Sequence, residues 1–137
     1  MKIVGCEEKI DIISLEVYDL DVKIDTGADG NSIHCDHLKI ENNEVSFRLL
    51  DKAHKNFNNK HFTFPIHEIK NIKSSNGEVQ LRPVIKLDVE FFGRKSKMEV
   101  SLTDRSNMKY PMLMGKSFLK HKYLVDVSKK LLSVRDK

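Results

Sequence analysis

The sequence Asp25-Thr26-Gly27-Ala28 directly follows a short alternating strand at residues 20–24, and it constrains the fold more than any other feature. Gly27 allows a sharp backbone turn at a place where a Cβ atom would clash. The hydroxyl group of Thr26 can bond to neighbouring backbone and lock the turn. The pattern therefore predicts a strand that ends by delivering one carboxylate, that of Asp25, into a pocket.

Length and composition indicate one globular domain over residues 1–137, large enough for a sizeable core and too short for two. No apolar run approaches the roughly 18–20 residues of a membrane span, and the first residues lack the apolar stretch of a secretory signal. Cys6 and Cys35 are too few for a disulfide framework. We therefore expect a cytoplasmic protein with free thiols and no membrane partner.

The net charge of +4 is modest, and the lysines are scattered along the chain rather than clustered. A nucleic-acid-binding protein normally shows a denser basic patch with aromatic residues among it, and this chain has no Trp. The composition therefore excludes nucleic acid as the expected partner. A mild excess of positive charge is compatible with an acidic substrate.

Short segments rich in β-branched and alternating apolar residues dominate the chain. They predict strands at residues 10–13, 15–18, 20–24, 45–49, 62–64, 85–91, 98–102, 123–127 and 131–134. Residues 92–97 read as the loop of a core hairpin, and the polar residues 51–61 as a surface loop. Only residues 116–120, after Gly115, suggest a helix. The pattern predicts an all-β sandwich or small barrel.

A second hairpin is predicted between residues 69–73 and 78–83, around the pair Asn76-Gly77. Asn-Gly is a strong signal for a two-residue hairpin turn. Both arms are polar at alternate positions and lack a continuous apolar face. We therefore expect this hairpin to project from the protein rather than to pack into its core.

Several short motifs follow one another in a fixed order along the chain. They occupy residues 23–28, 32–34, 75–77, 82–85, 102–105, 108–113, 113–116 and 124–127. In this order they resemble the retropepsin-like aspartic peptidases. The match is closer to one branch, the RimB-like family labelled as ATP-dependent zinc proteases and associated with RimK-type ATP-grasp ligases. The resemblance runs from about residue 3 to residue 130.

The resemblance implies a closed β-barrel with a flap hairpin and one short helix after Gly115. It implies an aspartic endopeptidase that acts as a homodimer, because the chain has only one Asp-Thr-Gly. The catalytic residues would be Asp25, Thr26 and Gly27 of each subunit. The two Asp25 carboxylates would share one proton and activate a water, with no cofactor and no metal.

The resemblance also implies which residues contact a peptide substrate. These substrate-binding residues are Ala28, Asp29, Ser75, Asn76, Gly77, Arg82 and Arg105. The association with ligases that add glutamates suggests that the substrate is an acidic or glutamate-tailed peptide, with a functional link to an ATP-grasp glutamate ligase. Basic residues near the cleft, including Lys73, would suit such a substrate.

Two positions depart from the family pattern. The family usually has Gly-Arg where this chain has Gly115-Lys116, and a basic residue where it has Asp29. Asp29 and Lys116 could therefore form a swapped version of an ion pair at the base of the site. Because Lys cannot make the bidentate contact that Arg makes, we expect looser support for the loop.

Two other functions stay open. The chain could be a catalytically silent domain that binds a peptide or a partner ligase through the same cleft. It could also be a zinc-dependent peptidase, with donors among His34, Cys35, Asp36, His37, His54, His61 and His67. Their spacing matches no common zinc motif, and neighbouring strand residues face opposite sides, so we expect no metal site. Residues 131–134 or the N-terminal strands are expected to pair between subunits.

Overall fold

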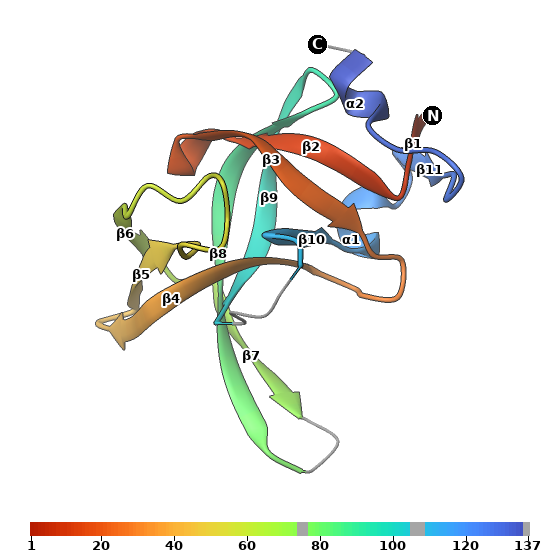
Figure 1. The fold of residues 1–137 in the computed structure, drawn as a ribbon. Coiled ribbons are helices and arrows are strands. Elements are labelled where there is room, and N and C mark those ends of the chain that lie inside the picture. Colours follow the sequence, from red (N-terminus) through yellow and green to blue (C-terminus); the bar gives the residue numbers. More distant parts are fainter. Residues whose placement is uncertain (74–76, 105–108, 136–137) are drawn as a thin grey trace.

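The computed structural model describes residues 1–73, 77–104 and 109–135. Eleven strands dominate this part of the chain (Figure 1). They are β1 (Lys2–Val4), β2 (Glu7–Ile12), β3 (Val17–Ile24), β4 (Asn31–Glu41), β5 (Glu44–Leu49), β6 (His61–Pro65), β7 (Glu68–Lys73), β8 (Val79–Phe91), β9 (Arg94–Thr103), β10 (Met112–Met114) and β11 (Tyr123–Val125). The helical elements are a 3-10 turn, η1 (Ile13–Leu15), and two single-turn helices, α1 (Lys116–Leu119) and α2 (Leu132–Arg135).

Six strands close into a barrel. Around the ring, β3 pairs with β2, β2 with β8, β8 with β9 and β9 with β4. The three-residue strand β10 closes the ring, because it pairs in parallel with β3 and antiparallel with β4. Strands β5 and β6 extend the sheet beyond β4, and β7 pairs with β8 alone. The predicted all-β closed barrel with a short helix after Gly115 is confirmed.

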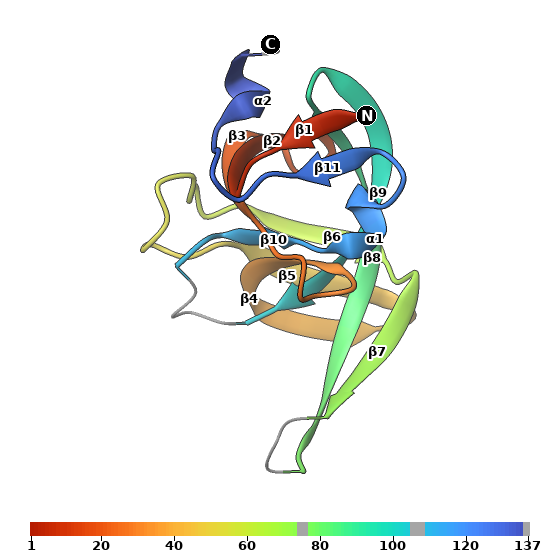
Figure 2. The same ribbon diagram turned by 90° about the vertical axis from the view of Figure 1, so that its right-hand side faces the viewer.

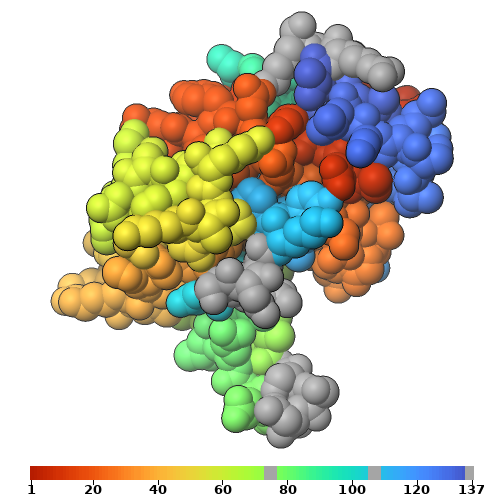
Figure 3. All heavy atoms as spheres, viewed as in Figure 1, coloured from red at the N-terminus to blue at the C-terminus, as the bar shows by residue number. Residues whose placement is uncertain are grey.

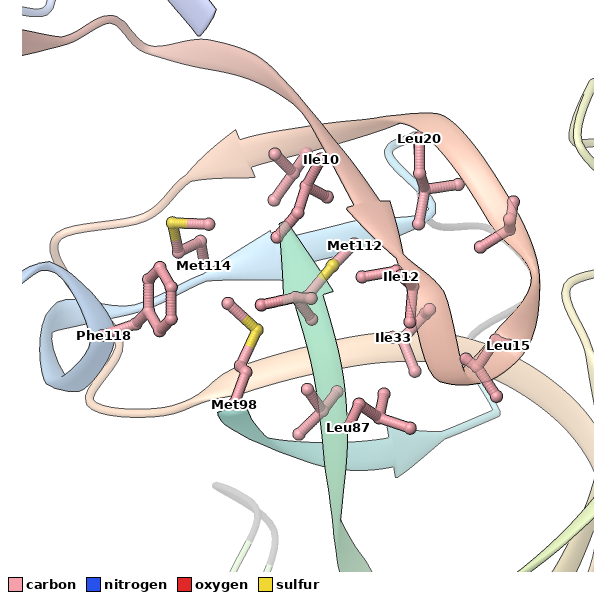
Figure 4. Packing of buried hydrophobic residues seen from close by; sticks show 14 of the residues in the cluster. Ile10, Ile12, Leu15, Leu20, Ile33, Leu87, Met98, Met112, Met114 and Phe118 are labelled. Atoms are coloured by element: carbon pink, nitrogen blue, oxygen red, sulfur yellow. The ribbon is translucent and has the colours of Figure 1, made fainter. Parts of the chain in front are cut away.

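The barrel interior is filled by the alternating apolar residues of its strands. Ile10 and Ile12 of β2 and Leu20 of β3 are completely buried, which is why the period-two pattern predicted strands there. Met112 of β10 lies among them (Figure 4) and is also completely buried. The strand that closes the barrel is therefore itself part of the core.

The core hairpin is longer and tighter than its sequence predicted. Strands β8 and β9 are joined by a two-residue turn, Phe92-Gly93, in which both residues have positive φ, 54° and 72°. Such a turn matches the right-handed twist of the strands it joins. Residues 94–97, predicted as loop, therefore belong to β9.

The hairpin of β7 and the first half of β8 projects from one end of the barrel, as predicted (Figures 1 and 2). The space-filling view shows it standing away from the body of the molecule (Figure 3). Its register places Lys70 directly opposite Arg82. The predicted turn at Asn76 lies outside the described residues.

The two ends of the chain lie together, at the end of the molecule opposite the hairpin (Figure 1). Strand β1 pairs in parallel with β11 of the same chain. Residues 131–134, predicted as a strand, instead lead into helix α2. The carboxylate of the buried Glu8 explains this, since it accepts hydrogen bonds from the backbone N–H groups of Leu132 (3.2 Å) and Ser133 (2.8 Å). Residues 13–15, also predicted to be largely strand, form η1, which ends at Glu16 with a φ of 53°.

None of the helices in the described ranges has the length and apolarity needed to cross a membrane.

Glu8 is the polar group that ties the two ends of the chain together. It also accepts a hydrogen bond from the N–H of Gly5 (2.8 Å), so its loss would leave three backbone N–H donors without their acceptor. We expect Glu8→Ala to lower the free energy of unfolding by ~3 kcal/mol in a urea titration. The matched control, Glu44→Ala at an exposed hairpin position, is expected to change it by less than ~0.5 kcal/mol. Equal effects of the two changes would contradict this role.

Candidate functional site

The loop of residues 25–30 presents a carboxylate at the end of strand β3. The backbone N–H of Asp25 donates to the carbonyl of Met114 at 2.8 Å, which fixes where the strand ends. One carboxylate oxygen of Asp25 accepts the N–H of Gly27 at 3.1 Å, and the N–H of Ala28 donates to the Asp25 carbonyl at 3.2 Å. Asp25 remains partly exposed. The turn thus holds its acid by backbone groups and leaves the other carboxylate oxygen open.

A second segment, residues 114–117, crosses this loop and is bonded to it throughout. The N–H groups of Lys116 and Ser117 donate to the carbonyls of Ala28 and Asp29, each at 2.9 Å. The preceding residue, Gly115, lies so close to the loop that an added Cβ would be 2.3 Å from the carbonyl oxygen of Gly30. Only glycine fits at this crossing, because no real Cβ approaches a backbone atom so closely.

The buried side chain of Asn31 joins the crossing to the barrel. Its carbonyl oxygen accepts the N–H of Gly115 at 3.0 Å, and its amide group donates to the carbonyl of Glu99 at 2.9 Å. Analysis of the sequence missed this residue. The only signal was an amide at the start of a strand of mixed polar and apolar residues, which by itself does not reveal its distant partners.

Two expectations for the loop are wrong within this chain. The hydroxyl of Thr26 makes no hydrogen bond to the described residues, and the turn is held by backbone groups instead. An added Cβ at Gly27 would meet only the Asp25 carboxylate, at an ordinary 3.4 Å. The folding of this chain therefore does not require Thr26 or Gly27, and both present their exposed surfaces to whatever else occupies the site.

A cleft of about 350 Å³ surrounds Asp25. Its walls come from loop 25–30, from β4, β9 and β10, and from the projecting hairpin, which contributes Lys70, Ile72 and Arg82. The ammonium group of Lys70 reaches the loop, since it would lie 3.2 Å from a Cβ placed on Gly30. The hairpin therefore forms one wall of the cleft that holds the carboxylate, and we call it the flap.

The flap carries two cations on the face that looks into the cleft. Lys70 and Arg82 are directly opposite in the register, an arrangement that costs free energy when both side chains are charged. The guanidinium of Arg82 is held by the side-chain oxygen of Gln80, at 3.1 and 3.2 Å. This pair places two positive charges in the wall of the cleft that also contains Asp25 and Asp29.

Asp29 and Lys116 form the swapped ion pair that the sequence suggested. Their charged atoms are 3.2 Å apart, with the side chains 94% and 57% exposed. A pair so open to water contributes little free energy, at most about 1 kcal/mol. The loop is therefore held by the backbone crossing rather than by this pair.

A larger hollow, of about 630 Å³, lies on the other side of the loop. Thr26 and Asp29 line it together with α1 and strand β11, and its apolar walls include Leu119, Tyr123 and Val125. It does not include Asp25. The two hollows therefore differ in kind, since one contains the carboxylate and the other is an open apolar surface beside it.

The structure brings together four of the residues predicted to form the site: Asp25, Ala28, Asp29 and Arg82 line one cleft. Gly77 lies at the exposed end of the hairpin, outside that lining. Ser75, Asn76 and Arg105 are not among the described residues, and neither is the side chain of Lys73. Lys70 and Ile72, which sequence analysis missed, share the inner face of the flap. The sequence signal for this was their spacing of two residues, which puts both on one face of the predicted hairpin, the face of Arg82.

The run of donors at residues 34–37 is dispersed by the fold. Cys35 is buried, and burial raises the pKa of its thiol far above the usual value. Asp36 accepts two hydrogen bonds from Arg48, at 2.8 and 2.6 Å, and these lower the pKa of the Asp36 carboxyl. His37 packs against His61, with ring centres 6.1 Å apart. Asp36 and His37 therefore have separate partners, Arg48 and His61.

A family model described as "Retropepsin-like aspartic endopeptidase RimB" matches residues 3–136. Two curated relatives, from Shewanella halifaxensis and Shewanella pealeana, are each named a probable alpha-L-glutamate ligase. Each is 33% identical to this chain over 130 residues, covering 92% of it. This chain spans only 28% of the length of these relatives.

A crystal structure of a Legionella pneumophila protein of unknown function has the same fold. It aligns with a TM-score of 0.73 over 96% of this chain and 98% of its own, at 24% identity. At that identity the likeness concerns the fold alone.

The crossing of loop 25–30 by Gly115 gives a direct test with a matched glycine. We expect Gly115→Ala to lower the free energy of unfolding by more than ~3 kcal/mol, because the new Cβ meets two carbonyl oxygens at 2.3 and 2.7 Å. Gly27→Ala, in the same loop, is expected to cost less than ~1 kcal/mol. Urea denaturation of both variants measures the difference. Similar stabilities would mean that the crossing does not hold the loop.

Proposed function

Because this chain belongs to the RimB-like family of retropepsin-like aspartic endopeptidases, we propose that it hydrolyses peptide bonds with the Asp25 carboxylate as its catalytic group. The observation that carries the proposal is the position of this acid. It lies partly exposed in a cleft, at the end of a strand, with one oxygen held by a backbone N–H and a flap above it. One oxygen of this carboxylate helps to hold the turn, and the other is open to a bound peptide.

The second carboxylate would come from a second copy of the chain. The sequence supplies only one Asp-Thr-Gly, and two carboxylates are needed to share a proton. Two features support a self-association face beside Asp25: the exposed Thr26, and the apolar hollow that Thr26 lines together with Leu119, Tyr123 and Val125. This face would replace the strand exchange between subunits that the sequence suggested.

In such a dimer, one Asp25 would be ionised and its partner protonated, since two like charges in contact cannot both ionise. The ionised carboxylate would take a proton from water as the water oxygen attacks the peptide carbonyl carbon. The protonated carboxyl would give its proton to the carbonyl oxygen. The proton taken from water would then pass to the leaving amine as the C–N bond breaks.

The proposed mechanism explains the glycine at position 27, whereas the packing of the protomer does not require it. An added Cβ there meets nothing closer than 3.4 Å in the chain, so a glycine is not required by the protomer itself. A peptide backbone or the loop of a second copy that approaches Asp25 would need the space. The flap over the cleft would close on the substrate and exclude bulk water.

We further propose that the substrate is an acidic peptide. Lys70 and Arg82 are opposed on the flap, and an anionic ligand between them would relieve their repulsion. The Shewanella relatives are named as glutamate ligases, and this chain is similar to a part of them. A peptidase linked to an ATP-grasp glutamate ligase would trim glutamate tails that the ligase adds.

One prediction distinguishes a peptidase from a catalytically silent binding domain. We expect Asp25→Asn to abolish cleavage of a glutamate-tailed peptide and of a mixed peptide library between pH 4 and 8, read by mass spectrometry. Asp88→Asn, at an exposed acid distant from loop 25–30 in the sequence, is expected to cleave like the wild type. Cleavage at 25 °C should survive a chelator, because the mechanism uses no metal.

Each other outcome has a defined meaning. No cleavage by the wild-type protein under any condition would favour a silent domain that binds peptides through the same cleft. Cleavage that survives Asp25→Asn and disappears with a chelator would favour a zinc-dependent peptidase. Either result would overturn the aspartic mechanism.

Another prediction concerns the charge of the substrate. We expect Lys70→Ala and Arg82→Ala each to raise KM for a glutamate-tailed peptide roughly fivefold, the equivalent of about 1 kcal/mol for one partly exposed ion pair. For a neutral peptide of the same length, KM is expected to stay unchanged. The control is Lys86→Ala, which removes a lysine of the same strand outside the cleft. An equal loss on both peptides would show that the flap cations do not read substrate charge.

A further inference from the structure

A cluster of three side chains outside the Asp25 cleft has the composition of a metal site. It consists of His34 from β4 and of Asp51 and His54 from the loop after β5. One potential ligand atom from each lies within 4.8 Å of the other two. None of the three lines the Asp25 cleft. Imidazole nitrogen and carboxylate oxygen are the donors that Zn²⁺ takes in protein sites with three protein ligands.

The backbone around the cluster fixes its side chains. The N–H of His34 donates to the carbonyl of Pro111 at 2.9 Å, and its own carbonyl accepts the N–H of Leu50 at 3.1 Å. Asp51 accepts the N–H of Ala53 with one carboxylate oxygen, at 2.9 Å. Its other carboxylate oxygen forms a hydrogen bond or ion pair with Nε2 of His34 at 2.7 Å, so a bound ion would take the place of the shared proton. An outer contact that orients a carboxylate in this way is typical of metal ligands.

Two buried polar atoms beside His34 have no hydrogen-bond partner in the described structure. One is Nε2 of His54, whose ring centre lies 5.5 Å from that of His34. The other is the hydroxyl of Thr103, which is opposite His34 in the β4–β9 register. An unsatisfied buried polar atom costs about 1–3 kcal/mol and calls for a missing partner. A bound cation would accept the lone pair of His54 Nε2.

We propose that His34, Asp51 and His54 bind one Zn²⁺ or a similar divalent transition-metal ion. The ion would fasten the loop of residues 50–60 to the barrel strand β4. A water would take the fourth position, as in other zinc sites with three protein ligands. The role is structural and goes beyond the proposed function, because no ligand of the ion belongs to the Asp25 cleft.

The proposal is tested on the whole protein after metal removal, with ZnCl₂ alone as the probe. Isothermal titration is expected to show one Zn²⁺ per chain. At a free zinc concentration about 100-fold above Kd, Tm is expected to rise by roughly 5–15 °C. Co²⁺ in place of Zn²⁺ should give the visible absorption of a four- or five-coordinate ion. Asp25→Asn should bind zinc as the wild type does, so failure of the proposed catalysis and failure of this site are distinguishable.

Two variants and one control identify the ligands. His54→Ala and the near-isosteric Asp51→Asn are each expected to weaken zinc binding by more than the roughly 10–100-fold that loss of an outer contact costs. Circular dichroism checks that both remain folded. His61→Ala removes an exposed histidine that packs on His37 and is expected to leave binding unchanged. Loss of binding in His61→Ala, or a wild-type protein that binds no zinc, would overturn the proposal.

Discussion

The crossing of loop 25–30 by residues 114–117 is the constraint on which the candidate site depends. Backbone bonds at Ala28 and Asp29, and the absence of a Cβ at Gly115, let the two segments lie in contact. Asn31 then ties the crossing to the barrel wall through Gly115 and Glu99. Because backbone atoms and the single side chain of Asn31 make these contacts, the position of the Asp25 carboxylate depends little on the other side chains around it.

The same segment closes the barrel. Strand β10 leads directly into Gly115, and it pairs with β3 on one side and β4 on the other. The ring of six strands and the geometry of the acid loop therefore have one common element. This arrangement explains why the site lies at the end of β3, since Asp25 is bonded to the last residue of β10, Met114. It also leaves Thr26 and Gly27 facing outward, where a second chain or a peptide can reach them.

The sequence predicted the parts of the fold that follow from local chemistry. Period-two alternation located most of the core strands, and Gly115 marked the start of α1 correctly. Prediction from the sequence failed where a group distant in the chain overrides the local preference for a strand or a helix. Residues 131–134 look like a strand, yet the Glu8 carboxylate, more than a hundred positions away, accepts their backbone N–H groups and starts a helix. Asn31 was missed for the same reason, because an amide in a strand does not reveal its partners.

The sequence by itself determined the acid of the candidate site, the turn that presents it, the projecting hairpin and the all-β class. These depend on residue types at short spacing, such as the alternation of apolar residues along strands and the acid whose carboxylate accepts the N–H of Gly27. Only the tertiary structure decided that Lys70 faces the acid loop beside Arg82, that β1 pairs with β11, and that His34 meets His54. Strand register and barrel closure bring such residues together, and neither can be read from neighbours in the chain.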